Sequence, residues 1–213
     1  MNKTTLTIAV TSVGTLLAVG SASADFQGFS IDEVENGMAG LTTYRVYADL
    51  EAGGQLDAVF GDGVDELLIE STTSFYQNQF GTYSSPSAAL FSFFPSLEFD
   101  SFVTIGLLDD AGDAMLDIGI DWTDFEDNGG DIWTDNGTWF ATPDEAQVFE
   151  DGGRVLIGQF TSDGDVMGTV SLQGKNEDLT NWQHRSVTFS TIPAPGAIAL
   201  LGIAGIAARR RRK

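Results

Sequence analysis

Carboxylates concentrated in two stretches are the side chains best suited to chemistry in this chain. Calcium prefers six to eight oxygen ligands, and loops dense in Asp, Asn and Gly can wrap carboxylates and carbonyls around one ion. Neither stretch matches the EF-hand pattern or a glycine-rich nonapeptide repeat, so solvated loop charges are the competing explanation. The candidate calcium ligands are Asp109, Asp110 and Asp113 in the first stretch and Asp121, Asp124, Asp127 and Asp131 in the second, with Asp117, Glu126, Asn128 and Asp135 nearby.

Tryptophans among the same acids favour a second kind of site. Sugar sites on β-sandwiches place aromatic faces against the C–H side of a sugar ring and use Asp, Asn or Gln for its hydroxyl groups. Trp122 and Trp133 are flanked by acids, and we expect them to be the exposed pair. Burial in the core is the alternative, because most aromatic rings must be buried to hold a fold of this size together.

Motifs for enzymatic chemistry are scarce. The chain has one histidine, His184, and no cysteine, which argues against a His/Cys zinc centre and leaves neither thiol chemistry nor disulfides. No G-x-S-x-G motif accompanies His184, and no P-loop or dinucleotide fingerprint occurs. A glycosidase-type pair remains, either Glu98 with Asp100 or Asp124 with Glu126. We therefore expect no catalysis. Calcium is the one candidate cofactor that the sequence suggests.

The acidic residues are confined to the middle of the chain. All 31 lie between Asp25 and Asp178, whereas residues 25–191 contain four basic residues, so this body has a net charge of −27. Such a body repels the phosphates of nucleic acids. Its expected partners are cations, basic surfaces or neutral glycans.

Runs of β-branched and aromatic residues predict strands at 41–50, 101–108 and 154–161, each ending at a cluster of Gly and Asp. No sustained 3.6-residue apolar period occurs between the two ends of the chain. The sequence therefore predicts an all-β fold, a single antiparallel β-sandwich of jelly-roll or immunoglobulin-like type.

Two local signals refine this prediction. Asp163-Gly164, between Phe160 and Val166, predicts a hairpin turn. A short helix is expected at 143–146, after Thr142 as its N-cap.

The N-terminus resembles a secretion signal in its layout. Lys3 precedes an apolar stretch from Leu6 to Val19, and Ala22-Ser23-Ala24 forms an A-x-A cleavage site before Asp25. We expect residues 1–24 to be a helical signal peptide, and the mature, exported chain to start at Asp25.

The C-terminal residues 192–213 have a three-part layout. A Pro- and Gly-containing breaker is followed by an apolar run at 197–208, expected to be a short helix, and by a basic tail at 209–213. Arginines at the end of an apolar helix stay on the cytoplasmic side of a membrane. Because the run is shorter than the ~20 residues of a comfortable span, a transient membrane signal is favoured over a permanent anchor.

This tail resembles the PEP-CTERM sorting signal of exported bacterial proteins, also called the ice-binding protein C-terminal domain. Its motif here reads Pro-Ala-Pro at 193–195, with alanine in place of the family's glutamate. The resemblance implies recognition by an exosortase-type transpeptidase, transient contact with the inner membrane, and delivery to the cell surface or extracellular matrix. The residues assigned to the sorting motif are Pro193, Ala194, Pro195, Gly196, Arg209, Arg210, Arg211 and Arg212.

The body resembles secreted bacterial proteins of uncharacterised function that carry this tail, through residues 43–48, 58–61, 75–77 and 94–106. The resemblance implies one extracellular domain over 25–191 and offers no catalytic residues. We expect a structural or adhesive role, with exopolysaccharide or cell-surface proteins as partners. A carbohydrate-binding module is the alternative, and a glycoside hydrolase is less favoured.

Overall fold

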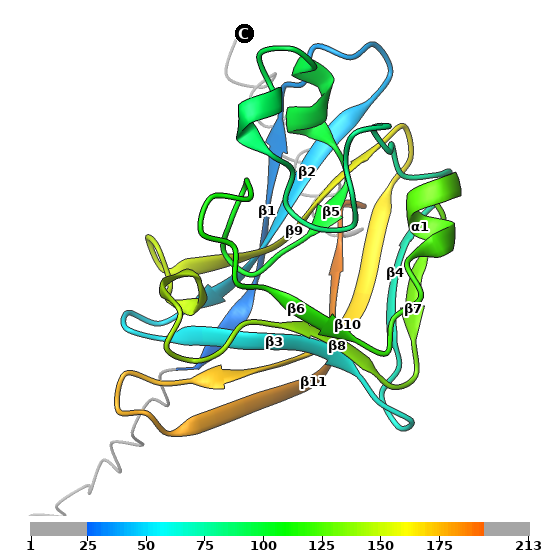
Figure 1. Cartoon of the computed structure of the whole chain (residues 1–213). Coiled ribbons are helices and arrows are strands. Elements are labelled where there is room, and N and C mark those ends of the chain that lie inside the picture. The colour runs from blue at the N-terminus through cyan, green and yellow to red at the C-terminus, as the bar shows by residue number, and fades with distance from the viewer. Residues whose placement is uncertain (1–24, 194–213) are drawn as a thin grey trace, which may run out of the picture.

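A computed structural model of the chain describes residues 25–193 (Figure 1). The expected signal peptide and the sorting segment from Ala194 onward, including both helices expected there, lie outside the described residues. Within residues 25–193 the fold consists mainly of two antiparallel sheets with one short α-helix, which confirms the all-β prediction. No helix in this described part is both long and apolar enough to cross a bilayer.

The smaller sheet has four strands in the order β1-β2-β9-β5. In β2, Val46, Ala48 and Leu50 are buried at alternate positions, as expected for a strand with one face on a core. The opposite face is polar and carries the ion pair of Arg154 with Asp32 at 2.7 Å. The four strands are β1 (Phe26–Val34), β2 (Thr42–Leu50), β9 (Arg154–Ser162) and β5 (Phe102–Val103).

The larger sheet has seven strands and forks at its centre. Along one edge of β10, the second half pairs with β3 and the first half with β4, while β11 pairs with the other edge. The outer members are β8 and β6 beyond β3, and β7 beyond β4. The seven strands are β3 (Gln55–Gly61), β4 (Leu67–Ser71), β6 (Leu116–Ile118), β7 (Ile132–Thr134), β8 (Gly137–Phe140), β10 (Val166–Lys175) and β11 (Asn181–Ser190).

One hydrophobic core lies between the two sheets. It joins Val46 and Phe160 of the smaller sheet to Trp139 and Phe189 of the larger one. The indole N–H of Trp139 donates to the carbonyl oxygen of Thr104 at 3.1 Å, so even the largest buried ring has its polar atom satisfied. Strands whose apolar residues alternate therefore pack as two layers on a shared interior.

Within residues 25–193 the loops contain four short helices: α1 (Thr123–Asn128) and the 3₁₀ helices η1 (Ala88–Leu90), η2 (Pro95–Phe99) and η3 (Ala146–Val148). Helix α1 was not predicted from the sequence, because six residues are too few to show a helical period. It ends at Gly129 in the left-handed conformation.

The strand expected at 101–108 is largely absent. Regular strand geometry is limited to β5, although the chain stays buried from Ser101 to Ile105. At Gly106 the backbone turns with a φ of 80°, and a Cβ there would collide with the carbonyl oxygen of Gln147. The regular ladder ends at Val103, and irregular hydrogen bonds to β9 continue from the N–H groups of Thr104 and Gly106 before the chain turns.

The hairpin predicted at Asp163-Gly164 is wrong. The turn exists, but it connects β9 of the smaller sheet to β10 of the larger sheet. Hydrogen bonds tie this corner to the loop after β4, the N–H of Thr72 donating to the oxygen of Asp165 at 2.9 Å. Turn residues show where the chain reverses, but the partner of each strand is decided by long-range packing.

The helix predicted at 143–146 is also wrong. The N–H of Glu145 donates to the oxygen of Thr142 at 3.0 Å, which makes a single turn. The 3₁₀ helix η3 follows it, with Glu145 extended at its N-cap. Gln147 of η3 is buried and donates to the carbonyl oxygen of Ile105 at 2.9 Å, so this tertiary contact sets the helix position.

Candidate functional site

The outer face of the larger sheet carries a row of four side chains across four strands. Trp133 of β7 lies opposite Leu68 of β4, Leu68 opposite Thr169 of β10, and Thr169 opposite Thr188 of β11. Paired residues in antiparallel strands point to the same face. Their neighbours along β4 and β7, Leu67 and Ile132 among them, are buried, which places the row on the outside.

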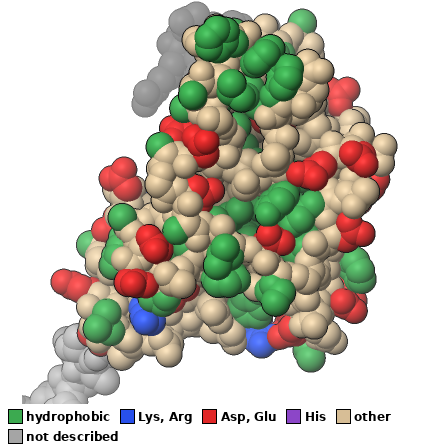
Figure 2. Space-filling view, viewed as in Figure 1, with side chains coloured by type: hydrophobic (Ala, Val, Ile, Leu, Met, Phe, Trp, Pro, Cys, Tyr) green, Lys and Arg blue, Asp and Glu red, His purple; other side chains and the backbone are tan. Residues whose placement is uncertain are grey.

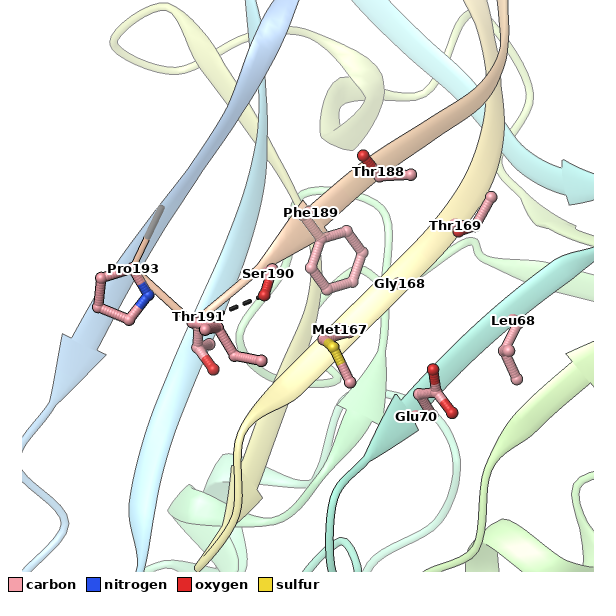
Figure 3. A pocket seen from close by; sticks show the side chains of 11 residues that line it. Leu68, Glu70, Met167, Gly168, Thr169, Thr188, Phe189, Ser190, Thr191 and Pro193 are labelled. Carbon is pink, nitrogen blue, oxygen red and sulfur yellow. Dashed lines mark hydrogen bonds between the residues drawn. The ribbon is translucent and has the colours of Figure 1, made fainter. Parts of the chain in front are cut away.

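A second row runs parallel to the first, two residues further along. Glu70 lies opposite Met167, and Met167 opposite Ser190. The second row and the first row from Leu68 to Thr188 line a shallow depression of about 680 Å³, which reaches Pro193 at the end of the described chain (Figure 3). Trp133 lies outside the lining, beyond Leu68. The depression therefore offers one carboxylate, several hydroxyl groups and apolar patches.

Trp133 stands at one edge of these rows and is 51% exposed, so its predicted exposure is confirmed. Its indole N–H donates to the carboxylate of Glu66 at 3.2 Å, which holds the ring in place. Trp133 thus places an exposed aromatic ring at the end of a row that contains two threonine hydroxyl groups. Sugar sites combine such a ring, packed against C–H groups, with side chains that hydrogen-bond the hydroxyl groups.

The expectation that Trp122 is exposed is wrong. Its side chain is 8% exposed and belongs to the core, next to Trp139. The Trp122 ring stacks on Tyr83 with centroids 4.6 Å apart, and both donate to the carboxylate of Asp117, Tyr83 at 2.7 Å and Trp122 at 3.0 Å. The hydrogen bond to Asp117 raises the pKa of Tyr83 to about 12. One of the acids near Trp122, Asp117, thus accepts a hydrogen bond from its indole N–H within the fold.

The predicted calcium ligands serve largely as local caps. Asp109 accepts from the N–H of Ala111 at 2.9 Å, and Asp121 from that of Thr123 at 3.0 Å. The hydroxyl and N–H of Thr123 hold the pKa of Asp121 below its usual value. These are Asx-type contacts, in which a carboxylate satisfies a backbone N–H two residues on.

The remaining acids of the two stretches do not converge. Asp113 accepts from the N–H of Met115 and from Gln147, and Asp124 accepts from Asn128 across one turn of α1. No group of three or more acidic or histidine side chains in residues 25–193 is placed to hold a metal ion, Asp110, Asp127 and Asp131 included. The second stretch is divided by α1, with Asp121 before the helix, Asp124 and Asp127 within it and Asp131 after it.

The candidate catalytic residues lie apart from the depression. His184 is 3.6 Å from the carboxylate of Asp25, where β11 meets the start of β1. Asp100 is fully buried and Glu98 is exposed, so the two face different environments. Burial raises the pKa of Asp100 to about 7, opposed in part by the hydrogen bond from the N–H of Asn78.

Sequence reasoning missed most of the face, including Leu68, Thr169 and Thr188. Each is an ordinary member of an alternating strand, and its position beside Trp133 depends on the pairing order of four strands. The one available signal was the alternation of β4, which identifies Leu68 and Glu70 as outward but not their neighbours.

Comparisons of the chain with family models, with curated proteins and with solved structures found no match. The site is therefore interpreted from its own geometry.

Proposed function

We propose that this chain is an exported, non-catalytic surface or matrix protein that adheres to polysaccharide through the outer face of its larger sheet. The observation that carries this proposal is the row from Trp133 to Thr188 beside a shallow depression. An open face suits a polymer, which must pass across the site, better than an enclosed pocket would.

The charge of the body narrows the ligand class. With a net charge of −27, the body repels acidic polysaccharides, and Glu66 and Glu70 add negative charge at the site itself. We therefore propose a neutral glycan, whose hydroxyl groups would donate to Glu70 and to the threonine side chains.

A non-catalytic role is supported by the distribution of carboxylates. Glycosidases need two carboxyl groups on either side of the scissile bond. Glu70 is the one carboxylate lining the depression, and both pairs considered from the sequence belong to other parts of the fold. A calcium-dependent ligand site has less support, because the acids of the two stretches are separated.

The finer fold type is part of the proposal. Two antiparallel sheets around one core support a β-sandwich of jelly-roll or immunoglobulin-like type, in which an outer sheet face is free to bind a ligand.

Sorting by an exosortase-type enzyme is proposed from the tail sequence alone. The signal peptide, the Pro-Ala-Pro motif, the short apolar run and the arginines agree on export followed by transient membrane contact. The intact mass of the protein from its native cell tests this, since a mass that still includes Arg209 to Lys213 contradicts processing.

Binding to a panel of neutral polysaccharides, measured by affinity electrophoresis with and without calcium, tests the adhesive role. We expect saturable binding that Trp133→Ala weakens about tenfold or more, because burying a large aromatic ring is worth roughly 1.5–3 kcal/mol. Phe93→Ala, which removes an even more exposed ring away from this face, is the matched control. Unchanged binding by Trp133→Ala contradicts the assigned face, and absence of all binding leaves a purely structural coat role.

A further inference from the structure

The segment between Glu70 and Glu98 contains no charged residue, in a chain with 31 acidic residues. Part of it forms the end of the molecule that carries η1 and η2 (Figure 1). We call this part, Phe80 together with residues 88–97, the aromatic lobe. This uncharged stretch sets the aromatic lobe apart from the acidic remainder of the body.

Large apolar side chains are exposed together on the aromatic lobe. Phe93 is 75% exposed, Phe80 43% and Phe94 36%, and the rings of Phe80 and Phe94 stack with centroids 3.9 Å apart. Figure 2 shows hydrophobic side chains gathered at this end of the molecule. Single exposed apolar residues are ordinary, whereas a contiguous group of them marks an interaction surface.

The aromatic lobe is held in shape from below. The N–H of Asn78 donates to Asp100 at 2.7 Å, its amide group donates to Ser96 at 3.0 Å, and its side-chain oxygen accepts from Phe80 at 3.1 Å. Leu97, the last residue of the lobe, is fully buried. The phenylalanine rings are thus presented to the outside by a built framework, which lowers the entropic cost of binding.

The aromatic lobe starts at the same corner of the fold where the described chain ends. The N–H of Tyr76, just before the lobe, donates to Thr161 at 2.7 Å, and the N–H of Thr191 donates to Val166 at 2.9 Å. Thr161 and Val166 flank the short connection from β9 to β10. Pro193 follows two residues after Thr191, so the chain leaves the body near the base of the lobe.

The sequence beyond this exit brings the body close to any membrane that holds the tail. Three residues separate Pro193 from the apolar run that begins at Ala197. An extended chain of that length covers about 10 Å. A bilayer that accepts the apolar run would therefore lie near the corner from which the aromatic lobe extends.

We propose that the aromatic lobe rests on a lipid bilayer, with Phe93, Phe80 and Phe94 inserted at the interface between headgroups and acyl chains. This inference rests on the proposed membrane tail, which places the bilayer near the lobe. The test measures insertion of the lobe separately from binding of the tail. The bilayer is zwitterionic, because anionic headgroups repel a body with a charge of −27.

A second copy of this chain is the rival occupant, and two observations count against it. Stable interfaces between proteins bury about 800 Å² on each partner, far more than three partly exposed rings can supply. Two bodies of charge −27 also repel each other on approach. A bilayer requires neither a large patch nor complementary charge.

The absence of native cysteine allows a single probe to report on the lobe in the full chain. Ser92→Cys places an environment-sensitive fluorophore between the exposed rings, and Asn181→Cys places the same probe at the end of β11 opposite to the chain exit as the matched control. Each labelled protein is mixed with phosphatidylcholine vesicles, with and without phosphatidylglycerol, and binding of the whole chain is followed by flotation.

We expect the Ser92 probe to shift to shorter wavelength and to be quenched by lipid-borne quenchers, while the Asn181 probe does neither. Phe93→Ser combined with Phe80→Ser should reduce the Ser92 response about tenfold or more in phosphatidylcholine vesicles, to whose neutral surface the basic residues 209–213 are not attracted. Because these side chains are exposed, the variant is expected to keep its fold, which thermal unfolding verifies.

Three results overturn the proposal. A chain that floats with vesicles while the Ser92 probe stays in water shows a membrane tail without lobe insertion. A chain that does not float at all shows that neither the tail nor the lobe binds the bilayer. A Ser92 shift that occurs without lipid and grows with protein concentration identifies a second copy as the occupant.

Discussion

Asp100 is a carboxyl group buried at the base of the aromatic lobe with only part of its hydrogen bonding satisfied. One oxygen accepts from Asn78, and the other has no partner in the described part of the chain. Gly81 packs against this second oxygen, and no larger residue would fit there. Burial raises the pKa of Asp100 to about 7, because a charge at this position loses its hydration.

This pKa predicts a stability that falls as the pH rises. Below about pH 4, Asp100 is neutral in both the folded and the unfolded chain. Between pH 4 and 7 the unfolded chain loses the proton while the folded chain keeps it, so folding is weakened by up to about 4 kcal/mol. The loss is complete above pH 7.

Asp100→Asn removes this titration and should flatten the pH dependence of the free energy of unfolding between pH 5 and 8. Urea denaturation at both pH values measures it. Glu98→Gln, which neutralises an exposed neighbour, should leave the wild-type slope in place. If both variants keep that slope, burial of Asp100 is not the source of the pH dependence.

Trp122 and Trp133 lie in similar sequence surroundings but should respond differently to truncation. Trp122→Ala leaves a cavity beside Trp139 and frees Asp117 from one donor, which should cost about 3–5 kcal/mol of unfolding free energy. Trp133→Ala removes an exposed ring and should cost less than about 1 kcal/mol. Chemical denaturation measures the unfolding free energy of each variant. Equal losses in the two variants would contradict the burial of Trp122 and the exposure of Trp133.

At the scale of elements, the corner between β9 and β10 shows how a loop can join two sheets. The hydroxyl of Ser162 donates to the carbonyl of Ser74 at 2.8 Å and accepts from the N–H of Gly164 at 2.9 Å. These bonds attach the loop after β4 to the end of β9. The corner thereby links the smaller sheet, the larger sheet and the base of the aromatic lobe.

Helix α1 depends on its C-terminal glycine for two reasons. Gly129 has a φ of 65°, and a Cβ there would collide with the carbonyl oxygen of Phe75. Its N–H donates to Phe125 at 3.0 Å, and its carbonyl accepts from Phe75 at 2.8 Å, so the glycine joins the helix to the core.

Gly129→Ala should therefore lower the melting temperature more than conformational strain alone would. Gly112→Ala is the matched control, since Gly112 has a φ of 78° with open space around its Cβ position. The left-handed conformation alone costs about 1–2 kcal/mol, and the collision should add a similar amount or more. Thermal unfolding of both variants measures the difference, and equal shifts would show that the contact with Phe75 is unimportant.

At the scale of the whole molecule, the acidic charge opposes compaction. A net charge of −27 on the body creates self-repulsion that ions screen, with a Debye length of ~10 Å at 0.1 M salt. We expect the melting temperature to rise with sodium chloride between low and moderate ionic strength. A melting temperature insensitive to salt would show that the charges are too far apart to interact.

Calcium at matched ionic strength separates screening from a specific site. Since the acids of the two predicted stretches cap local backbone groups, we expect calcium chloride to raise the melting temperature little more than sodium chloride does. A much larger rise, reversed by a chelator, would reveal a site that the acids form on binding the ion. Asp121→Asn and Asp113→Asn would then identify which stretch supplies it.

Composition and local pattern by themselves determined the class of fold. Strands β2 and β9 were predicted within one residue of their ends, because alternating apolar residues follow the pleat of a strand. The sequence alone also shows the acidic character of the body and the lack of disulfides, and it is the basis of the export and sorting hypotheses. The uncharged segment between Glu70 and Glu98 was also readable from the residues.

The tertiary structure decided everything that depends on which segments meet. Asp163-Gly164 has the residues of a hairpin, yet packing places its strands in different sheets. Trp122 and Trp133 both have acidic residues near them in the sequence. Trp122 is nevertheless buried in the core and donates to Asp117, whereas Trp133 is exposed on the surface. The candidate face joins residues from four strands far apart in sequence. Such long-range pairings follow from burial of the whole core, which no local window of sequence contains.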